Sequence, residues 1–243
     1  GLAQDQDRVN AKQLAGVVLN DPLLTLRVLS HQEVHRRRSQ NHDITTIDRA
    51  IMMMGVVPFF RTFADLPTVE EALAGHPKAL LGVIQMIART RRAAHIARDW
   101  AIIRHDLDVD EITVAALLHE TAEIVAWVFA PELTSRVHEL QRTKPGLRSA
   151  MAQQEVFGVA TRDLQLALIR AWHLPRLLAA LVDDSESDSP RVRNVTLAAD
   201  LARHSTTGWD DPALPDDLAA AEALLPITRR QIVSRLGVPA GQQ

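Results

Sequence analysis

Hydrophobic residues recur along most of this chain at the spacing of one face of an α-helix, and no segment alternates as a strand would. Residues typical of helix ends divide the pattern. Asp21-Pro22 starts a helix, because aspartate caps the first turn and proline suits the first helical position. Gly55 ends another helix, and Thr68 with Glu71 forms a capping box. The sequence therefore predicts an all-α protein, with helices at residues 9–19, 22–30, 46–54, 56–63, 77–104, 110–130, 131–140, 148–157, 163–172, 175–182, 190–204, 218–224 and 228–236.

The main interruptions of this pattern are polar. Residues 31–43 are basic and have no period, and residues 206–217 carry aspartates before two prolines, so both are predicted to be loops. Residues 183–190 are acidic and are expected to be exposed.

The segment Ile112–Pro131 is apolar on nearly all sides, which predicts a buried central helix. It contains His119, Glu120 and Glu123, and an ionisable group in such surroundings is costly unless it is hydrogen-bonded or paired. On one continuous helix His119 and Glu123 share a face and could ligate a metal. A zinc protease needs a second histidine where Glu123 stands, so that pattern is only half matched. The alternative is a buried histidine that bonds to a carboxylate or carbonyl.

Composition excludes several classes of chemistry. The 243 residues contain no cysteine, which excludes disulfides, thiol catalysis and cysteine-ligated zinc, and fits a reducing compartment. The net charge of −3 gives no general reason to expect nucleic-acid or membrane binding. No apolar run reaches the ~18 residues of a membrane span, and no secretory signal opens the sequence. We therefore expect a cytoplasmic protein.

Several segments, taken in order, resemble one known family. AALLHETAEIVAWVFAPE is similar to the central helix of the HD superfamily, whose hallmark is a His-Asp pair. The surrounding segments resemble its HD-related output domain (HDOD) branch, including the Trp-x-Leu-Pro turn at Trp172. The resemblance spans roughly residues 9–204 and implies an HD-like helical bundle; its segments are residues 20–30, 44–56, 88–101, 115–132, 158–182 and 194–204.

The resemblance also implies where an active site would be. HD enzymes are phosphohydrolases that hold a divalent metal in a histidine, a His-Asp pair and an aspartate, because the metal acidifies a water and clamps phosphate oxygens. Here the first histidine falls near Arg89 or Thr90, the pair becomes His119-Glu120, and the closing aspartate is Asp200, which otherwise is a solvated helix residue.

An arginine at position 89 would repel a metal ion, and the HDOD branch is taken to be non-hydrolytic. His95 is no substitute, because it lies about one and a half turns further along its helix and off the required face. The resemblance therefore implies a vestigial site at His119, Glu120 and Asp200, with no bound metal and no cofactor.

Two basic clusters could contact phosphates. One is His35 to Arg38 in a predicted loop, and the other comprises Arg89, Arg91 and Arg92 on a long helix. Both clusters could equally be solvated charges with acidic partners. No aromatic residues interleave them, so sequence-specific DNA binding is not expected. Met52 to Met54 could form an adaptable contact surface or fill a core.

These observations lead to one functional hypothesis and two alternatives. We expect a helical lobe at residues 1–75 and an HD-like bundle at residues 76–243, together one HDOD domain, with a ligand pocket in the crease between them. The leading hypothesis is a non-catalytic bacterial signal-transduction module, an output domain or scaffold. It would act through contacts with other signalling proteins or with further domains of the natural chain. The alternatives are a weak metal-dependent phosphohydrolase using His119, Glu120 and Asp200, and a module that binds a nucleotide second messenger through the arginines.

Overall fold

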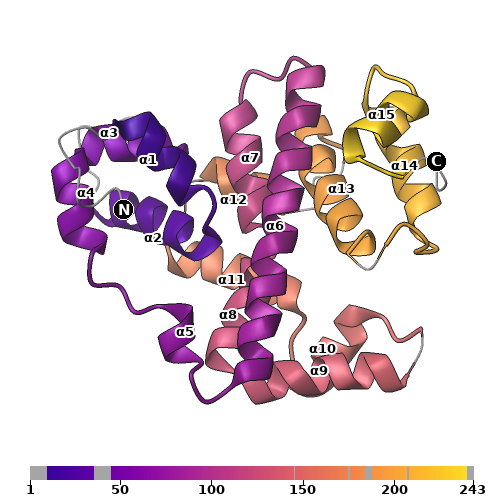
Figure 1. Ribbon diagram of the computed structural model, residues 1–243, viewed down its shortest axis with the longest axis horizontal. Helices are drawn as coiled ribbons and strands as arrows, with labels where there is room; N and C mark the ends of the chain where they lie inside the picture. Colours follow the sequence, from indigo (N-terminus) through magenta and orange to yellow (C-terminus); the bar gives the residue numbers. More distant parts are fainter. Residues whose placement is uncertain are drawn as a thin grey trace.

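The protein folds around one long helix. The computed structural model describes residues 10–35, 45–144, 146–174, 176–183, 188–206 and 208–239, and all regular secondary structure within these residues is helical. The longest helix, α6 (Pro77–Ile103), runs through the middle of the molecule in the view of Figure 1, with other helices on both sides of it. The all-α prediction is confirmed.

Four N-terminal helices form a group on one side of α6: α1 (Ala11–Val18), α2 (Pro22–Val34), α3 (Ile47–Met54) and α4 (Val56–Phe63) (Figure 1). Asp21 caps α2 as predicted, because its side chain accepts hydrogen bonds from the backbone of the first turn. The group contributes Leu29 and Ile51 to the same core as α6 and α7, and the boundary expected near residue 75 stays a prediction.

The loop predicted at residues 31–43 is wrong for residues 31–34, which continue α2. Tertiary contacts hold this polar turn in the helix: the Gln32 amide donates to the Ala50 carbonyl at 3.1 Å, and the His31 ring lies edge-on to Phe63. Residues 36–44, which include the arginines of the first basic cluster, lie outside the described residues.

Two hydrophobic cores lie along α6. The large core surrounds its C-terminal half and includes Trp100, with α7 (Val109–Leu118) and α13 (Pro190–His204) packed against it. The small core surrounds the N-terminal half and includes Trp127 of α8 (Thr121–Phe129). One side of this N-terminal half faces solvent, where Leu81 and Ile84 are more than half exposed.

The single helix predicted at residues 110–130 is wrong, because α7 ends at Leu118 and α8 begins at Thr121. Gln165 explains the break. Its amide donates to the Leu118 carbonyl at 2.8 Å and accepts from the Ala122 backbone at 2.6 Å, so it satisfies backbone groups that the interruption exposes. The break places His119 and Glu120 at a corner between two helices.

The apolar segment Val109–Phe129 meets the length and composition criteria of a membrane span, because it has 21 residues and its most apolar 18-residue window has a mean hydropathy of 1.5. The prediction that no run is long and apolar enough therefore does not hold for this segment. Since 67% of its most apolar window is buried within the fold, it has the burial expected of a core helix.

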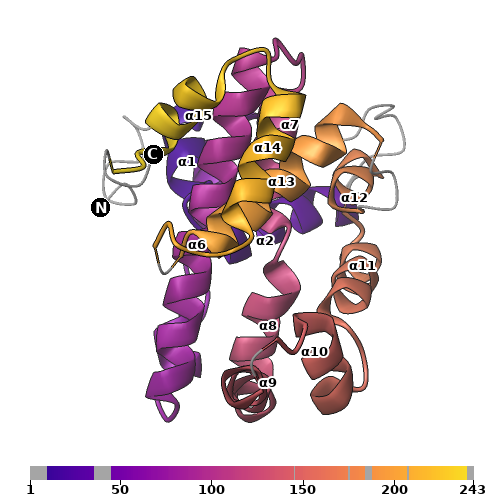
Figure 2. The ribbon, with the colours of Figure 1, turned by 90° about the vertical axis from the view of Figure 1, so that its right-hand side faces the viewer.

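The rest of the bundle is built from short helices. The short α5 (Val69–Ala72) begins with the predicted capping box. Helices α9 (Pro131–Thr143) and α10 (Ser149–Phe157) lie at the lower end in both views, below α13, α14 (Leu214–Leu224) and α15 (Arg229–Leu236) (Figures 1 and 2). The loop predicted at residues 206–217 is wrong from Leu214 onward, because Pro215 is tolerated in the first turn of α14 and the following aspartates suit its N-terminus. The remaining helices are α11 (Thr161–Ala171) and α12 (Arg176–Val182).

Candidate functional site

A pocket of about 470 Å³ opens inside the bundle, between the α7–α8 corner and helices α9, α10, α11 and α13. This volume lies within the range of small-molecule sites. The pocket does not lie in the predicted crease between the lobes. There the large core is continuous, and the Thr45 hydroxyl donates to Glu111 at 2.9 Å.

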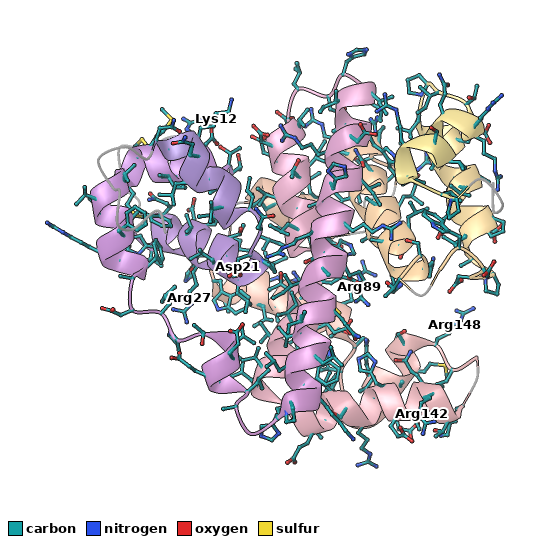
Figure 3. All side chains as sticks on the ribbon, in the orientation of Figure 1. Lys12, Asp21, Arg27, Arg89, Arg142 and Arg148 are labelled. Carbon is teal, nitrogen blue, oxygen red and sulfur yellow. The ribbon has the colours of Figure 1, made fainter. Side chains whose placement is uncertain are left out.

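The three predicted vestigial positions all line this pocket. His119 and Glu120 occupy the α7–α8 corner, and Asp200 faces them from α13. Arg89, predicted at the place of the first histidine, enters the same pocket from the middle of α6 (Figure 3). The positions that the family resemblance assigned thus lie around one pocket, and their role as a vestigial site stays a prediction. The corner that presents His119 and Glu120 was not foreseen.

The charged side chains form an ionic cluster of Arg89, Glu120, Glu123, Asp200 and Arg203. Arg89 donates to two carboxylates at once, from Nε to Glu120 at 2.7 Å and from Nη2 to Glu123 at 3.1 Å. Arg203 pairs with Asp200 and lies 3.9 Å from Glu120. Each carboxylate of the cluster thus has an arginine partner.

Burial and pairing act in opposite directions on these groups. Burial acts to lower the pKa of Arg89, but the charges of Glu120 and Glu123 outweigh it and raise that pKa. Burial likewise acts to raise the pKa of Glu123, and bonds to His138 and Arg89 outweigh it, so the pKa lies below its usual value. The arginine and this glutamate are both charged at neutral pH.

His138 extends the cluster to α9. Its Nε2 lies 3.5 Å from Glu123, and its ring stacks on Trp127 with centroids 5.0 Å apart. Sequence reasoning missed His138, Gln165 and Arg203. The spacing of Arg203 and Asp200, three residues apart on one helix, is a signal that could have found that pair.

The residues of the cluster do not fit a divalent metal. A catalytic ion would bind the Glu120 carboxylate at roughly 2.0–2.2 Å, but the Arg89 guanidinium already lies 2.7 Å from that group. Among the residues that the structure describes, no group of three or more histidine and carboxylate side chains is arranged to hold a metal. His95 is exposed on α6 and does not line the pocket.

The arginines proposed as a phosphate site do not converge. Arg89 lies in the pocket, whereas Arg91 donates to the Asn20 carbonyl between α1 and α2. Arg92 lies over the Trp209 ring at 5.2 Å, and burial lowers its pKa. Three arginines close together in sequence thus contact three different parts of the molecule.

Comparison with known proteins identifies the class. The family model of the HDOD domain matches residues 2–187, so the chain belongs to the HDOD family. None of the curated proteins matches the chain.

Several solved structures share the fold. The MmoQ response regulator from Methylococcus capsulatus has 20% sequence identity and a TM-score of 0.71, covering 98% of this chain and 93% of that one. A virulence factor from Campylobacter jejuni has 18% identity and a TM-score of 0.66, covering 96% and 89%. An HDOD domain protein of unknown function from Geobacter sulfurreducens has 17% identity and a TM-score of 0.54, covering 95% and 83%.

Proposed function

We propose that this protein is a non-catalytic signalling module that acts through contacts with other proteins. One observation carries the proposal: the Arg89 guanidinium binds both Glu120 and Glu123, at 2.7 and 3.1 Å, where an HD enzyme would hold its metal. Phosphate hydrolysis of the HD type needs a metal that acidifies water and stabilises charge on the phosphate oxygens. An arginine can stabilise such charge, but it cannot acidify a bound water.

The ionic cluster also supports a structural role for the former site. Glu120 and Glu123 come from the corner and first turn of α8, Arg89 from α6, and Arg203 from α13. Because paired charges with good geometry restrict how these helices can sit relative to one another, the cluster favours a rigid framework. A rigid helical framework with exposed faces is suited to docking.

The signalling part of the proposal draws on the neighbours. The chain is similar in fold to the MmoQ response regulator over almost its whole length. Identity of 20% supports a common fold, and a role in signal transduction is our extension of it.

The test combines metal analysis with turnover. The purified protein is incubated with Mn²⁺, Mg²⁺ or Zn²⁺, desalted and analysed for metal, and hydrolysis of p-nitrophenyl phosphate and its bis-ester is followed. We expect substoichiometric metal and no turnover that depends on His119. Stoichiometric metal, with hydrolysis abolished in His119→Ala, would instead establish the phosphohydrolase alternative.

The nucleotide-binding alternative has its own measurement. Calorimetry with a cyclic dinucleotide is run on the intact protein and on Arg89→Ala, with Arg98→Ala, an exposed arginine paired to Asp110, as the matched control. We expect no heat of binding from the intact protein. Saturable heat that only Arg89→Ala removes would support a second-messenger module.

A further inference from the structure

Two adjacent methionines on the N-terminal lobe are exposed to solvent. Met52 is 70% exposed and Met53 is 56% exposed on α3, and Val57 at the start of α4 is 41% exposed. Their neighbour Met54 instead packs against the large core. We call Met52, Met53 and Val57 the methionine patch. Its exposure is unusual because methionine side chains are more often buried.

Two arginines flank the patch. Arg49 precedes Met52 and Met53 by three and four residues on α3, and Arg61 follows Val57 by four residues on α4. Side chains at these spacings are neighbours on one helix face. Gly55, at φ +88, ends α3 and begins α4, so the two helices follow each other at a sharp corner.

The exposed charge of helices α1 to α4 is positive. Within the described residues of Ala11–Phe63 the carboxylates are half-buried, and Asp21 is engaged in capping α2. The cations of the same helices are all exposed, and Lys12 and Arg27 extend from α1 and α2 (Figure 3). Exposed carboxylates follow at Asp65, Glu70 and Glu71, so among the described residues up to 75 the positive exposed charge is confined to helices α1 to α4, in a chain whose net charge is −3. The exposed cations are Lys12, Arg27, Arg49 and Arg61.

We propose that the methionine patch, with Arg49 and Arg61, docks an acidic amphipathic helix of a partner protein. The inference rests on the proposed function and names the chemistry of the partner. Flexible, polarisable methionines adapt to different apolar side chains. An amphipathic helix presents a stripe of apolar side chains beside its charged face. Carboxylates flanking that stripe would pair with the arginines. A nucleic acid would satisfy the charge but not the apolar side chains.

The five methionines of the chain provide the reporters. The probe is a synthetic helical peptide of roughly 18 residues, because shorter helices are marginal in water. It carries leucines at helical spacing and glutamates beside them. Protein labelled with ¹³C at the methionine methyl groups is titrated with this peptide and observed by NMR. We expect the Met52 and Met53 signals to shift, while those of buried Met86 and of Met151 on α10 stay unchanged.

Variants distinguish binding at the methionine patch from nonspecific binding elsewhere on the protein. Met52→Glu combined with Met53→Glu should weaken binding about tenfold or more, the scale of losing a central apolar anchor. Arg49→Glu with Arg61→Glu should weaken it about three- to tenfold, and less at high salt because salt screens exposed charges. Met151→Glu is the matched control, since Met151 is an exposed methionine on another helix. Circular dichroism confirms that each variant is folded.

Several outcomes would overturn the inference. One is that a peptide with its leucine positions scrambled, or with lysine in place of glutamate, binds as tightly as the designed peptide. The others are a Met151 signal that shifts as much as those of Met52 and Met53, or no shift of any methionine signal. Tighter binding to duplex DNA or to anionic vesicles, or self-association that Met52→Glu removes, would assign the patch to another occupant. Each of these results leaves the metal and hydrolysis measurements unaffected, so a failure here is distinct from a failure of the proposed function.

Discussion

The two halves of α6 lie in different surroundings. The C-terminal half is buried in the large core, where Ala97 and Trp100 contact helices on several sides, whereas the N-terminal half packs mainly on α8 through Val83 and Met86. Arg89 lies between them and binds Glu120 and Glu123. One continuous helix thus joins a large apolar core to a small one, and ion pairs lie at the junction between them.

Trp100→Ala should have the largest effect on this comparison. Trp100 is fully buried in the large core, so its truncation should lower the free energy of unfolding by about 4 kcal/mol. The matched change in the small core, Trp127→Ala, should cost about half as much, because Trp127 belongs to a smaller cluster of buried residues and one face of its ring stacks on the exposed His138. Urea denaturation measures both values, and equal losses would remove the distinction between the cores.

Arg89→Ala should have the next largest effect. It leaves Glu120 and Glu123, whose side chains are 10% and 20% exposed, without their shared cation. Removing one partner of a buried ion pair leaves the other charge unpaired, which lowers the free energy of unfolding by roughly 3 kcal/mol. Adding Glu120→Gln and Glu123→Gln should restore part of the loss, which a mutant cycle quantifies. A loss below about 1 kcal/mol would mean that solvent screens the pair as it does at a surface.

Gly82→Ala tests the close packing of the small core. A Cβ atom at Gly82 would lie 2.7 and 2.8 Å from two ring atoms of Trp127, so the indole must move. We expect a loss of about 2 kcal/mol in unfolding free energy. Gly16→Ala is the control, because Gly16 lies at an exposed position of α1 with no atom near the new methyl group, and alanine there should add up to about 1 kcal/mol. A neutral Gly82→Ala would show that the small core is loosely packed.

The smallest effect concerns pH. Burial acts to raise the pKa of Glu123, yet His138 and Arg89 lower it below the unfolded value. The stability that Glu123 contributes is therefore complete above the unfolded pKa of about 4.3. It is lost as the pH falls through that value and then through the lower folded value. Denaturation midpoints measured from neutral to acidic pH should decline more steeply for the intact protein than for Glu123→Gln. Parallel declines would contradict the pairing.

Local signals explain which elements could be predicted. The bounds of α4 and α13 match the sequence because Gly55 and Pro190 mark their starts. The break between α7 and α8 could not be foreseen, since Gln165 stabilises it from a segment more than 40 residues away. The turn of α2 at Gln32 likewise depends on a distant carbonyl, that of Ala50.

The residues that line the candidate site could be predicted only in part. The family resemblance placed Arg89, His119, Glu120 and Asp200 in one site, and all four line the pocket. The resemblance could not indicate that Arg89 would bind Glu123 as well as Glu120, because that contact depends on the corner between α7 and α8. Nor could it place the pocket inside the bundle, where α9 and α10 provide a wall.

The cation that joins Glu120 to Glu123 is a side chain of the protein itself. It is made by the ribosome in a fixed ratio of one per molecule, and it can be neither chelated nor exchanged for another ion. Assembly of this junction therefore needs no insertion step after translation, and starvation for divalent ions leaves the charge balance of this ion pair unchanged.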